Sequence, residues 1–148
     1  MRLSLFAPID RWLAPAPGPG RVDWLRGAFF AHRGLHGADR PENSLAAFTA
    51  AAARGLGMEC DVQLTADDEA VVFHDFTLDR MTGQRGAVVE RTAAALSAIP
   101  LAGGGETIPS LRALLDVVAG RVPLLIELKS QRQWPISRLC WADRKSVV

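Results

Sequence analysis

The stretch "MECDVQLTADDEAVVFHD", from Met58 to Asp75, decides the fold, because acids and a histidine interrupt its apolar runs. Glu59 and Asp61 stand one residue apart within the first run, and His74 closes the second. Side chains two residues apart on a β-strand face the same side, about 6–7 Å from one another. If this run is a strand, its two acids point together. Gln63 then shares their face, and the opposite face carries Cys60, Val62 and Leu64.

Strand and helix patterns alternate along the rest of the sequence. Short runs rich in Leu, Ile and Val indicate strands. Helices are indicated by apolar residues at helical spacing, by capping Ser or Asn at the start and by Gly at the end. We expect strands at 27–34, 57–65, 70–75 and 122–130, and helices at 42–55, 88–99 and 109–120. Apolar strands separated by helices are typical of a parallel sheet, so the predicted fold class is α/β.

Length and composition indicate one globular domain. The chain has 148 residues, of which 49% are hydrophobic and 22% are charged, so it can form a core. A net charge of +1 without blocks of like charge favours neither nucleic acid nor an anionic membrane as a partner. No stretch approaches the roughly 20 apolar residues of a membrane span, and the N-terminus lacks a signal-peptide core.

The two cysteines, Cys60 and Cys140, lie far apart and do not have the spacing of a metal site. Cys60 falls within the apolar run and is expected to be a buried free thiol. This cysteine usage fits a reducing compartment. Together with the absence of a membrane span, it predicts a soluble, cytoplasmic protein.

Ionisable side chains mark the carboxyl ends of the predicted strands. In parallel α/β sheets, catalytic groups gather at this end, where each strand gives way to its loop. A single histidine or acid at such a position is more often structural, so the interpretation depends on all four strands having the pattern. Besides Glu59 and Asp61, the strands supply His32, Arg33, His74, Glu127 and Lys129.

These residue types indicate a metal-assisted reaction. Neighbouring carboxylates in a core repel one another and are costly to desolvate unless a positive charge lies between them. Glu59, Asp61 and Glu127 would offer an all-oxygen site for a hard ion such as Mg²⁺ or Ca²⁺. Arg33 and Lys129 add positive charge for an anionic substrate. Imidazoles carry protons near neutral pH, and the combination is suited to phosphodiester cleavage.

Other polar residues are undecided or have an ordinary role. Asp75 either orients His74 or caps the following loop, and Glu42 either caps the first helix or reaches into the site. His36 is expected to be exposed to solvent. A solvated turn is predicted for Asp67, Asp68 and Glu69.

Four segments, in order, resemble the motifs of the glycerophosphodiester phosphodiesterases. They are "AHRGLHGADRPENSLAAFTAA", "GMECDVQLTADDEAVVFHDFTLDRMTG", "ETIPSLRALLD" and "LLIELKS", between Phe30 and Ser130. The ordered set HRG, PEN-S/T, ExD, FHD, L-x-R-x-T-G and ExK is far more specific than any single short pattern. The resemblance implies a TIM-type barrel and metal-dependent hydrolysis of glycerophosphodiesters to an alcohol and glycerol 3-phosphate.

The resemblance implies the same site roles as the strand pattern. His32 and His74 correspond to the family's acid/base pair, Glu59, Asp61 and Glu127 to its metal ligands, and Arg33 and Lys129 to its phosphate contacts. Glu42 falls on the glutamate of the PEN motif, and Ser44 stands where the family commonly has Thr. Two alternatives remain. One is another phosphodiesterase with the same barrel, similar to phosphatidylinositol phospholipase C or sphingomyelinase D. The other is a non-catalytic phosphate- or metal-binding module.

A complete TIM barrel has eight strands and typically about 250 residues, whereas this sequence predicts about four strands. We therefore expect an incomplete barrel: a leader and Pro/Gly linker at 1–27, a partial domain at 28–130 and a truncated end at 131–148. "DRKSVV", at 143–148, matches one reading frame of a widely used sequencing adapter, and our hypothesis is that it derives from that adapter. A half-barrel exposes a sheet edge and an apolar face, so we expect this chain to be inactive alone.

Overall fold

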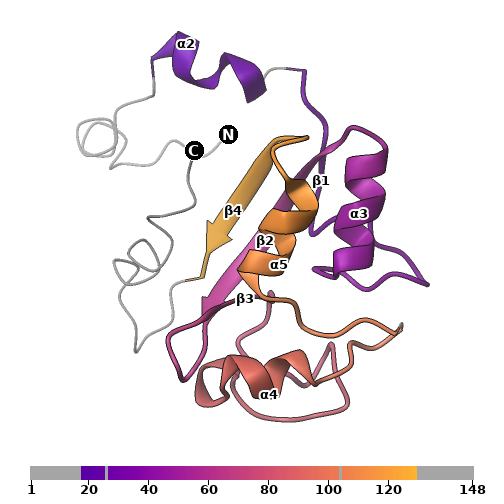
Figure 1. The fold of residues 1–148 in the computed structure, drawn as a ribbon, viewed down its shortest axis with the longest axis vertical. Helices are drawn as coiled ribbons and strands as arrows, with labels where there is room; N and C mark the ends of the chain where they lie inside the picture. The colour runs from indigo at the N-terminus through magenta and orange to yellow at the C-terminus, as the bar shows by residue number, and fades with distance from the viewer. Residues whose placement is uncertain (1–17, 26, 104, 130–148) are drawn as a thin grey trace, which may run out of the picture.

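The computed structural model describes residues 18–25, 27–103 and 105–129. Most of the expected leader, Cys140 and the expected end at 131–148 lie outside the described residues. A short helix, α2 (Pro19–Val22), and a 3-10 turn, η1 (Asp23–Leu25), precede the sheet (Figure 1). In the described ranges, no helix has the length and apolar character needed to cross a membrane.

The described strands form one sheet around β2 (Gly57–Leu64). Both β1 (Phe30–Ala31) and β4 (Leu124–Leu128) run parallel to β2. Because Met58 pairs with a residue of each, these two strands lie on opposite edges of β2. Helices stand between the parallel strands in the sequence, which confirms the predicted α/β class.

The third strand differs from the prediction, because β3 (Ala70–Val72) runs antiparallel to β2. It pairs Leu64 with Ala70 and Val62 with Val72. Only the turn Thr65–Glu69 separates the two strands, whereas parallel strands need a crossover of about a dozen residues or more. The expectation of four parallel strands was therefore wrong at β3, which forms a hairpin with β2.

Two helices, α3 (Leu45–Ala53) and α5 (Leu111–Val118), cover one face of this sheet (Figure 1). Each begins at a serine whose hydroxyl accepts a hydrogen bond from a backbone N–H of the first turn, as the sequence predicted. These caps are Ser44 and Ser110. The glycines predicted to end the helices, Gly55 and Gly120, both have positive φ.

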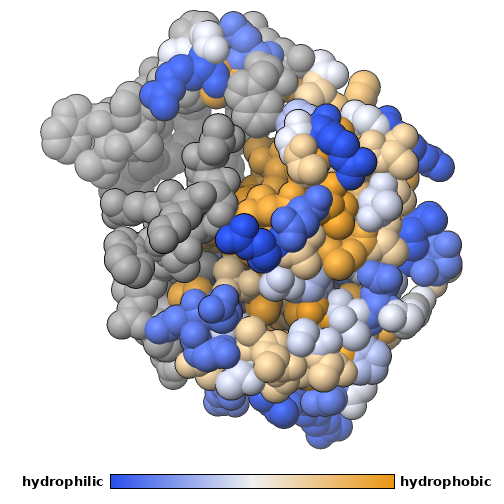
Figure 2. Space-filling view, in the orientation of Figure 1, coloured by the Kyte–Doolittle hydropathy of each residue, from blue (hydrophilic) through white to orange (hydrophobic). Residues whose placement is uncertain are grey.

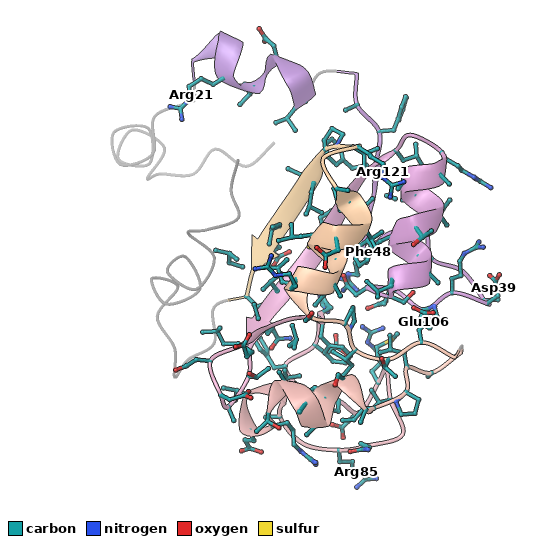
Figure 3. The ribbon with its side chains drawn as sticks, in the orientation of Figure 1. Arg21, Asp39, Phe48, Arg85, Glu106 and Arg121 are labelled. Carbon is teal, nitrogen blue, oxygen red and sulfur yellow. The ribbon has the colours of Figure 1, made fainter. Side chains whose placement is uncertain are left out.

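The main core lies between the sheet and these helices. Phe48 of α3 is completely buried and points toward α5 (Figure 3), and Leu114 of α5 is buried with it. The free thiol of Cys60 is buried here, as predicted. The side chains of β2 that enter this core are Met58, Cys60, Val62 and Leu64, which include the set predicted to face the helices.

A second apolar cluster lies under the segment between β3 and α5. This segment contains the 3-10 turn η2 (Val88–Glu90) and α4 (Ala93–Ser97), which replace the single helix predicted at 88–99. Phe73 is buried in this cluster, directly before His74, so packing holds the chain at that point. The other buried members are Val71, Leu78, Val88, Leu96, Ile99, Leu101 and Ile108.

The strand β4 is more exposed than its apolar sequence predicted. Leu125 and Ile126 are each 37% exposed, although a continuous apolar run in a parallel sheet predicts a strand buried on both faces. Figure 2 shows apolar side chains gathered over β4 and α5. Among the described strands, β4 pairs with β2 alone, so one edge of β4 lacks a described partner and its burial is incomplete.

Candidate active site

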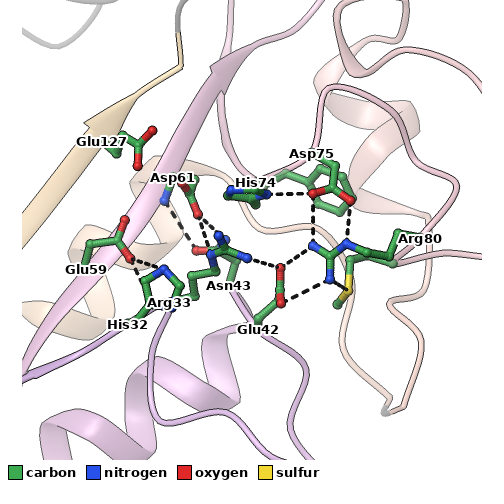
Figure 4. A network of polar contacts seen from close by, with 12 residues as sticks. His32, Arg33, Glu42, Asn43, Glu59, Asp61, His74, Asp75, Arg80 and Glu127 are labelled. Atoms are coloured by element: carbon green, nitrogen blue, oxygen red, sulfur yellow. Dashed lines mark hydrogen bonds and ion pairs between the residues drawn. The ribbon is translucent and has the colours of Figure 1, made fainter.

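The site forms where β1 and β3 approach one another along the same edge of β2. β1 pairs with the first residues of β2 and runs parallel, whereas β3 pairs with the last residues and runs back toward β1. The turns that follow both strands therefore meet beside Glu59 and Asp61 (Figure 4). His32 follows β1, and His74 follows β3. His74 reaches the site because the hairpin reverses the chain, and not because it ends a parallel strand.

Three carboxylates form a cluster at the centre of the site. Glu59, Asp61 and Glu127 each offer an oxygen, and these oxygens lie within 4.8 Å of one another. Glu59 and Asp61 share a face of β2, and Glu127 pairs with Asp61 in the register of β4. The side chain of Asp61 is 1% exposed and that of Glu127 is 57% exposed. The cluster is therefore closed at β2 and open to solvent at β4.

The buried Asp61 carboxylate has three partners. Lys129 Nζ lies 2.8 Å from its Oδ1, and Asn43 Nδ2 donates a hydrogen bond to its Oδ2 at 3.0 Å. Arg33 Nε lies 3.2 Å from Oδ2; its N–H makes no well-directed hydrogen bond to a described group, so this contact is an ion pair. Burial raises the pKa of Asp61, but the Lys129 and Asn43 hydrogen bonds and nearby positive charge outweigh it, so the net pKa is lowered.

Lys129 connects two of the three carboxylates. Its Nζ also donates a hydrogen bond to Glu127 Oε1 at 2.7 Å, and its backbone N–H donates to the Val62 carbonyl. Burial lowers the pKa of Lys129, but the hydrogen bonds to Asp61 and Glu127 outweigh it, and the net pKa is raised. The residue expected to contact phosphate therefore lies among the expected metal ligands.

Arg33 contacts the acids through both its backbone and its side chain. Its φ of 55° turns the backbone N–H toward Glu59, and this N–H donates to Oε2 at 3.0 Å. Its Nη1 donates to Glu42 Oε1 at 3.0 Å. Gly34 follows with φ of 79°, and a Cβ there would lie 2.9 Å from Ala47 of α3. The HRG turn thus needs its glycine to pack against the helix.

His74 is fixed on two sides. Its Nδ1 lies 2.6 Å from Asp75 Oδ1, and since an ionised carboxylate only accepts hydrogen bonds, Nδ1 carries the proton. This leaves Nε2 for a substrate proton. The buried Gln63 amide donates to the carbonyls of Phe73 and Asp75, at 2.8 and 2.7 Å, and clamps the backbone around His74. Of the two roles considered for Asp75, the geometry favours orienting His74.

His32 is held less tightly. Its Nε2 lies 4.0 Å from Glu59 Oε2, and its side chain is 68% exposed. His36 is exposed, as predicted. The predicted solvated turn is also exposed at all three acids, Asp67, Asp68 and Glu69.

Arg80, for which the sequence patterns predict no role, also belongs to this network. Its guanidinium donates to both oxygens of Asp75 and to both oxygens of Glu42 (Figure 4). These contacts, with those of His74, lower the pKa of Asp75 to about 2, although burial opposes them. Burial also raises the pKa of Glu42, but Arg80 and Arg33 outweigh it, and the net pKa is lowered.

Two missed residues, Arg80 and Asn43, each stand inside a quoted motif. Arg80 is the arginine of L-x-R-x-T-G, and Asn43 is the asparagine of PEN. The sequence pattern predicts a helix cap at Asn43, whereas its side chain donates a hydrogen bond to Asp61 and its φ is 56°. Glu42, left undecided, contacts Arg33 and Arg80 and so belongs to the site network.

The network carries an excess of negative charge. Among the described residues it joins five carboxylates to three permanent cations, so with neutral imidazoles the excess is two negative charges. A phosphodiester anion would be repelled by this excess, and a divalent cation would balance it. Three carboxylates are also the all-oxygen donor set that suits a hard ion. The residues present therefore fit such a metal.

A sequence model of the glycerophosphoryl diester phosphodiesterase family matches residues 32–144. The chain belongs to this family. The match begins at His32 of the HRG motif and extends past Ser130, the last residue of the quoted motifs.

Individual family members agree with this assignment. A glycerophosphodiester phosphodiesterase from Bacillus altitudinis is 37% identical over 107 residues, which cover 68% of this chain and 43% of that protein. A solved phosphodiesterase from Oleispira antarctica, in complex with the product sn-glycerol-3-phosphate, has a TM-score of 0.69 and 30% identity, covering 80% of this chain and 52% of that one. A solved glycerophosphodiester phosphodiesterase from Agrobacterium tumefaciens has a TM-score of 0.62 and 35% identity, covering 70% of this chain and 47% of that one. The chain spans about half the length of these relatives.

Proposed function

We propose that the protein carrying this sequence hydrolyses glycerophosphodiesters to an alcohol and glycerol 3-phosphate, a step of phospholipid degradation. The proposal depends on the observation that three carboxylates meet within 4.8 Å, at a point flanked by the turns of His32 and His74 (Figure 4). Family membership supports the reaction class. The Oleispira antarctica neighbour, solved with sn-glycerol-3-phosphate, supports a small glycerol-based substrate.

In this proposal, Glu59, Asp61 and Glu127 hold one divalent cation, Mg²⁺ or Ca²⁺. Bound there, the ion would supply positive charge to a phosphoryl oxygen and polarise the phosphorus–oxygen bond. Lys129 and Arg33 would contribute further charge to the phosphate. Lys129 lies at the side where Glu127 is open to solvent, so it can exchange a carboxylate contact for a substrate oxygen.

The two histidines transfer the protons. One imidazole removes a proton from the nucleophile, which is water or the neighbouring glycerol hydroxyl, and the other gives a proton to the leaving alcohol. When the glycerol hydroxyl attacks, the product is a cyclic phosphate, and water then opens the ring with the proton transfers reversed. Asp75 holds the Nδ1 side of His74 and leaves Nε2 available, which supports a role for Nε2 in accepting or giving a proton.

The described strands support a place within a TIM-type barrel. β1, β2 and β4 run parallel, as barrel strands do, and β4 has an edge without a described partner. The solved relatives are about twice as long as the part that aligns here. We infer that residues 1–148 alone are inactive.

The direct test is hydrolysis of glycerophosphocholine by the complete gene product, with and without Mg²⁺ or Ca²⁺. We expect release of glycerol 3-phosphate only when a metal is present. Phosphatidylinositol and sphingomyelin serve as competing substrates. Preferential cleavage of either would favour the related phosphodiesterases, and metal binding without any hydrolysis would favour a binding module.

A further inference from the structure

We propose that Arg80 is a positioning residue that fixes His74 for proton transfer by holding the Asp75 carboxylate in place. Arg80 acts through another residue and does not touch the reacting atoms. The inference deepens the proposed function and rests on it, because it assumes that His74 transfers a proton.

The contacts of Arg80 form a double fork. Toward Asp75, its Nε donates to Oδ2 at 2.6 Å and its Nη2 donates to Oδ1 at 3.0 Å. Toward Glu42, Nη2 donates to Oε1 at 2.6 Å and Nη1 donates to Oε2 at 3.3 Å. A guanidinium held by two carboxylates at once has little freedom to rotate, and the two carboxylates are restricted in the same way.

The Asp75 oxygen that meets His74 is one of those held by Arg80. Oδ1 accepts from His74 Nδ1 and from Arg80 Nη2, so its position depends on both donors. Without Arg80, the carboxylate could turn about its side chain into solvent, because Asp75 retains 23% exposure. The imidazole would then lose the partner that keeps its proton on Nδ1.

The same arginine connects two separate turns of the site. Glu42 lies 38 residues before Arg80 and also accepts from Arg33 at 3.0 Å, and Arg33 in turn pairs with Asp61. His74 is thereby tied to the carboxylate cluster through a continuous chain of charged contacts (Figure 4). A planar fork with donors on both sides is required, and the single ammonium of lysine lacks that geometry.

The kinetic test compares Arg80→Gln and Arg80→Lys in the complete gene product. Arg85→Gln is the matched control, since Arg85 is exposed, projects away from the sheet (Figure 3), and its side chain has no hydrogen bond or ion pair to a described residue. Loss of positioning should reduce kcat about 10- to 100-fold in Arg80→Gln, with KM changed little. Arg80→Lys should lie between Arg80→Gln and the control.

The second readout is the tautomer of the neutral His74 ring, observed by NMR of protein labelled with ¹⁵N-histidine. His74→Ala identifies the signal. We expect the Nδ1–H form in the parent protein and a mixture with the Nε2–H form in Arg80→Gln. A purely structural role of Arg80 would lower the melting temperature but leave the tautomer unchanged, and that result would overturn the proposal. If Arg80→Gln does not fold, Arg80→Lys provides the same comparison.

The His74→Ala variant separates the two claims. If it loses activity while Arg80→Gln retains the kcat of Arg85→Gln, the positioning role is wrong and the proposed function stands. If His74→Ala remains active, the proposed acid–base role of His74 fails, and an unchanged tautomer in Arg80→Gln would then overturn the positioning role as well.

Discussion

His32 and His74 lie at opposite ends of one short stretch of β2. His32 lies next to Glu59, with Nε2 at 4.0 Å from Oε2, and His74 follows Phe73, whose backbone N–H donates to the Asp61 carbonyl at 2.9 Å. This follows from β1 and β3 approaching the same edge of β2 in opposite directions. A phosphate bound over the two acids would have an imidazole on either side, as acid–base catalysis of its cleavage requires.

Replacing either histidine should therefore remove one proton transfer. For His32→Ala or His74→Ala in the complete gene product, we expect kcat on glycerophosphocholine to fall by about 10²- to 10⁴-fold. His36→Ala is the control, because His36 is exposed and belongs to no part of the network. Near-normal turnover in either of the first two variants would refute the role of that histidine.

Asp61 and Glu127 should differ in their effect on stability, although both are expected metal ligands. Asp61→Asn leaves Lys129 and Arg33 without their buried partner and should reduce the free energy of unfolding by about 3 kcal/mol. Glu127→Gln alters a side chain that is 57% exposed and should change it by no more than about 0.5 kcal/mol. Urea unfolding without metal measures both values. Equal losses of unfolding free energy in the two variants would contradict the expectation drawn from the different burial of Asp61 and Glu127.

Lys129 should weaken metal binding while it assists catalysis. Its ammonium lies 2.8 Å from Asp61 and 2.7 Å from Glu127, so it repels a cation that shares those carboxylates. We expect Lys129→Met to bind Ca²⁺ at least about tenfold more tightly by calorimetry, and to hydrolyse substrate more slowly. Arg112→Met, on the exposed side of α5, controls for the loss of one positive charge. An unchanged Ca²⁺ affinity in Lys129→Met would show that the Lys129 ammonium does not oppose metal binding.

Asp75 should stabilise the fold in a defined pH range. Its pKa is lowered from 3.8 to about 2, first by the Arg80 hydrogen bond. Because the folded pKa lies below the unfolded one, the stabilisation is complete above 3.8 and is lost as the pH falls toward 2. Asp75→Asn should thus be less stable than the parent above this range, with a difference that shrinks within it. Asp79→Asn, an exposed neighbour, should show no such convergence in denaturant unfolding.

The alternation of β2 was sufficient to predict which side chains share a face. A strand has a period of two, so Glu59 and Asp61 had to point together and Cys60 had to enter the core. The direction of β3 was missed because the apolar pattern of a strand does not carry its direction. The short turn Thr65–Glu69 did indicate the direction, because the crossover that parallel strands need does not fit into so few residues.

Other features depend on contacts between distant segments and could not be derived from local patterns. Arg80 and Glu42 pair across 38 residues, and nothing near Arg80 in the sequence indicates Glu42 as a partner. The exposure of Leu125 and Ile126 depends on which strand lies beside β4, which the run of apolar residues does not specify.

The central claim is that Glu59, Asp61 and Glu127 share one divalent cation. Calorimetric titration of the metal-free complete gene product with Mg²⁺ and Ca²⁺ tests it most directly, beside the variants Glu59→Gln, Asp61→Asn and Glu127→Gln. We expect one ion bound per chain, and at least about a tenfold loss of affinity in each variant, because each removes one charged ligand. Absence of binding in the parent protein, or three variants that bind as the parent does, would contradict the account.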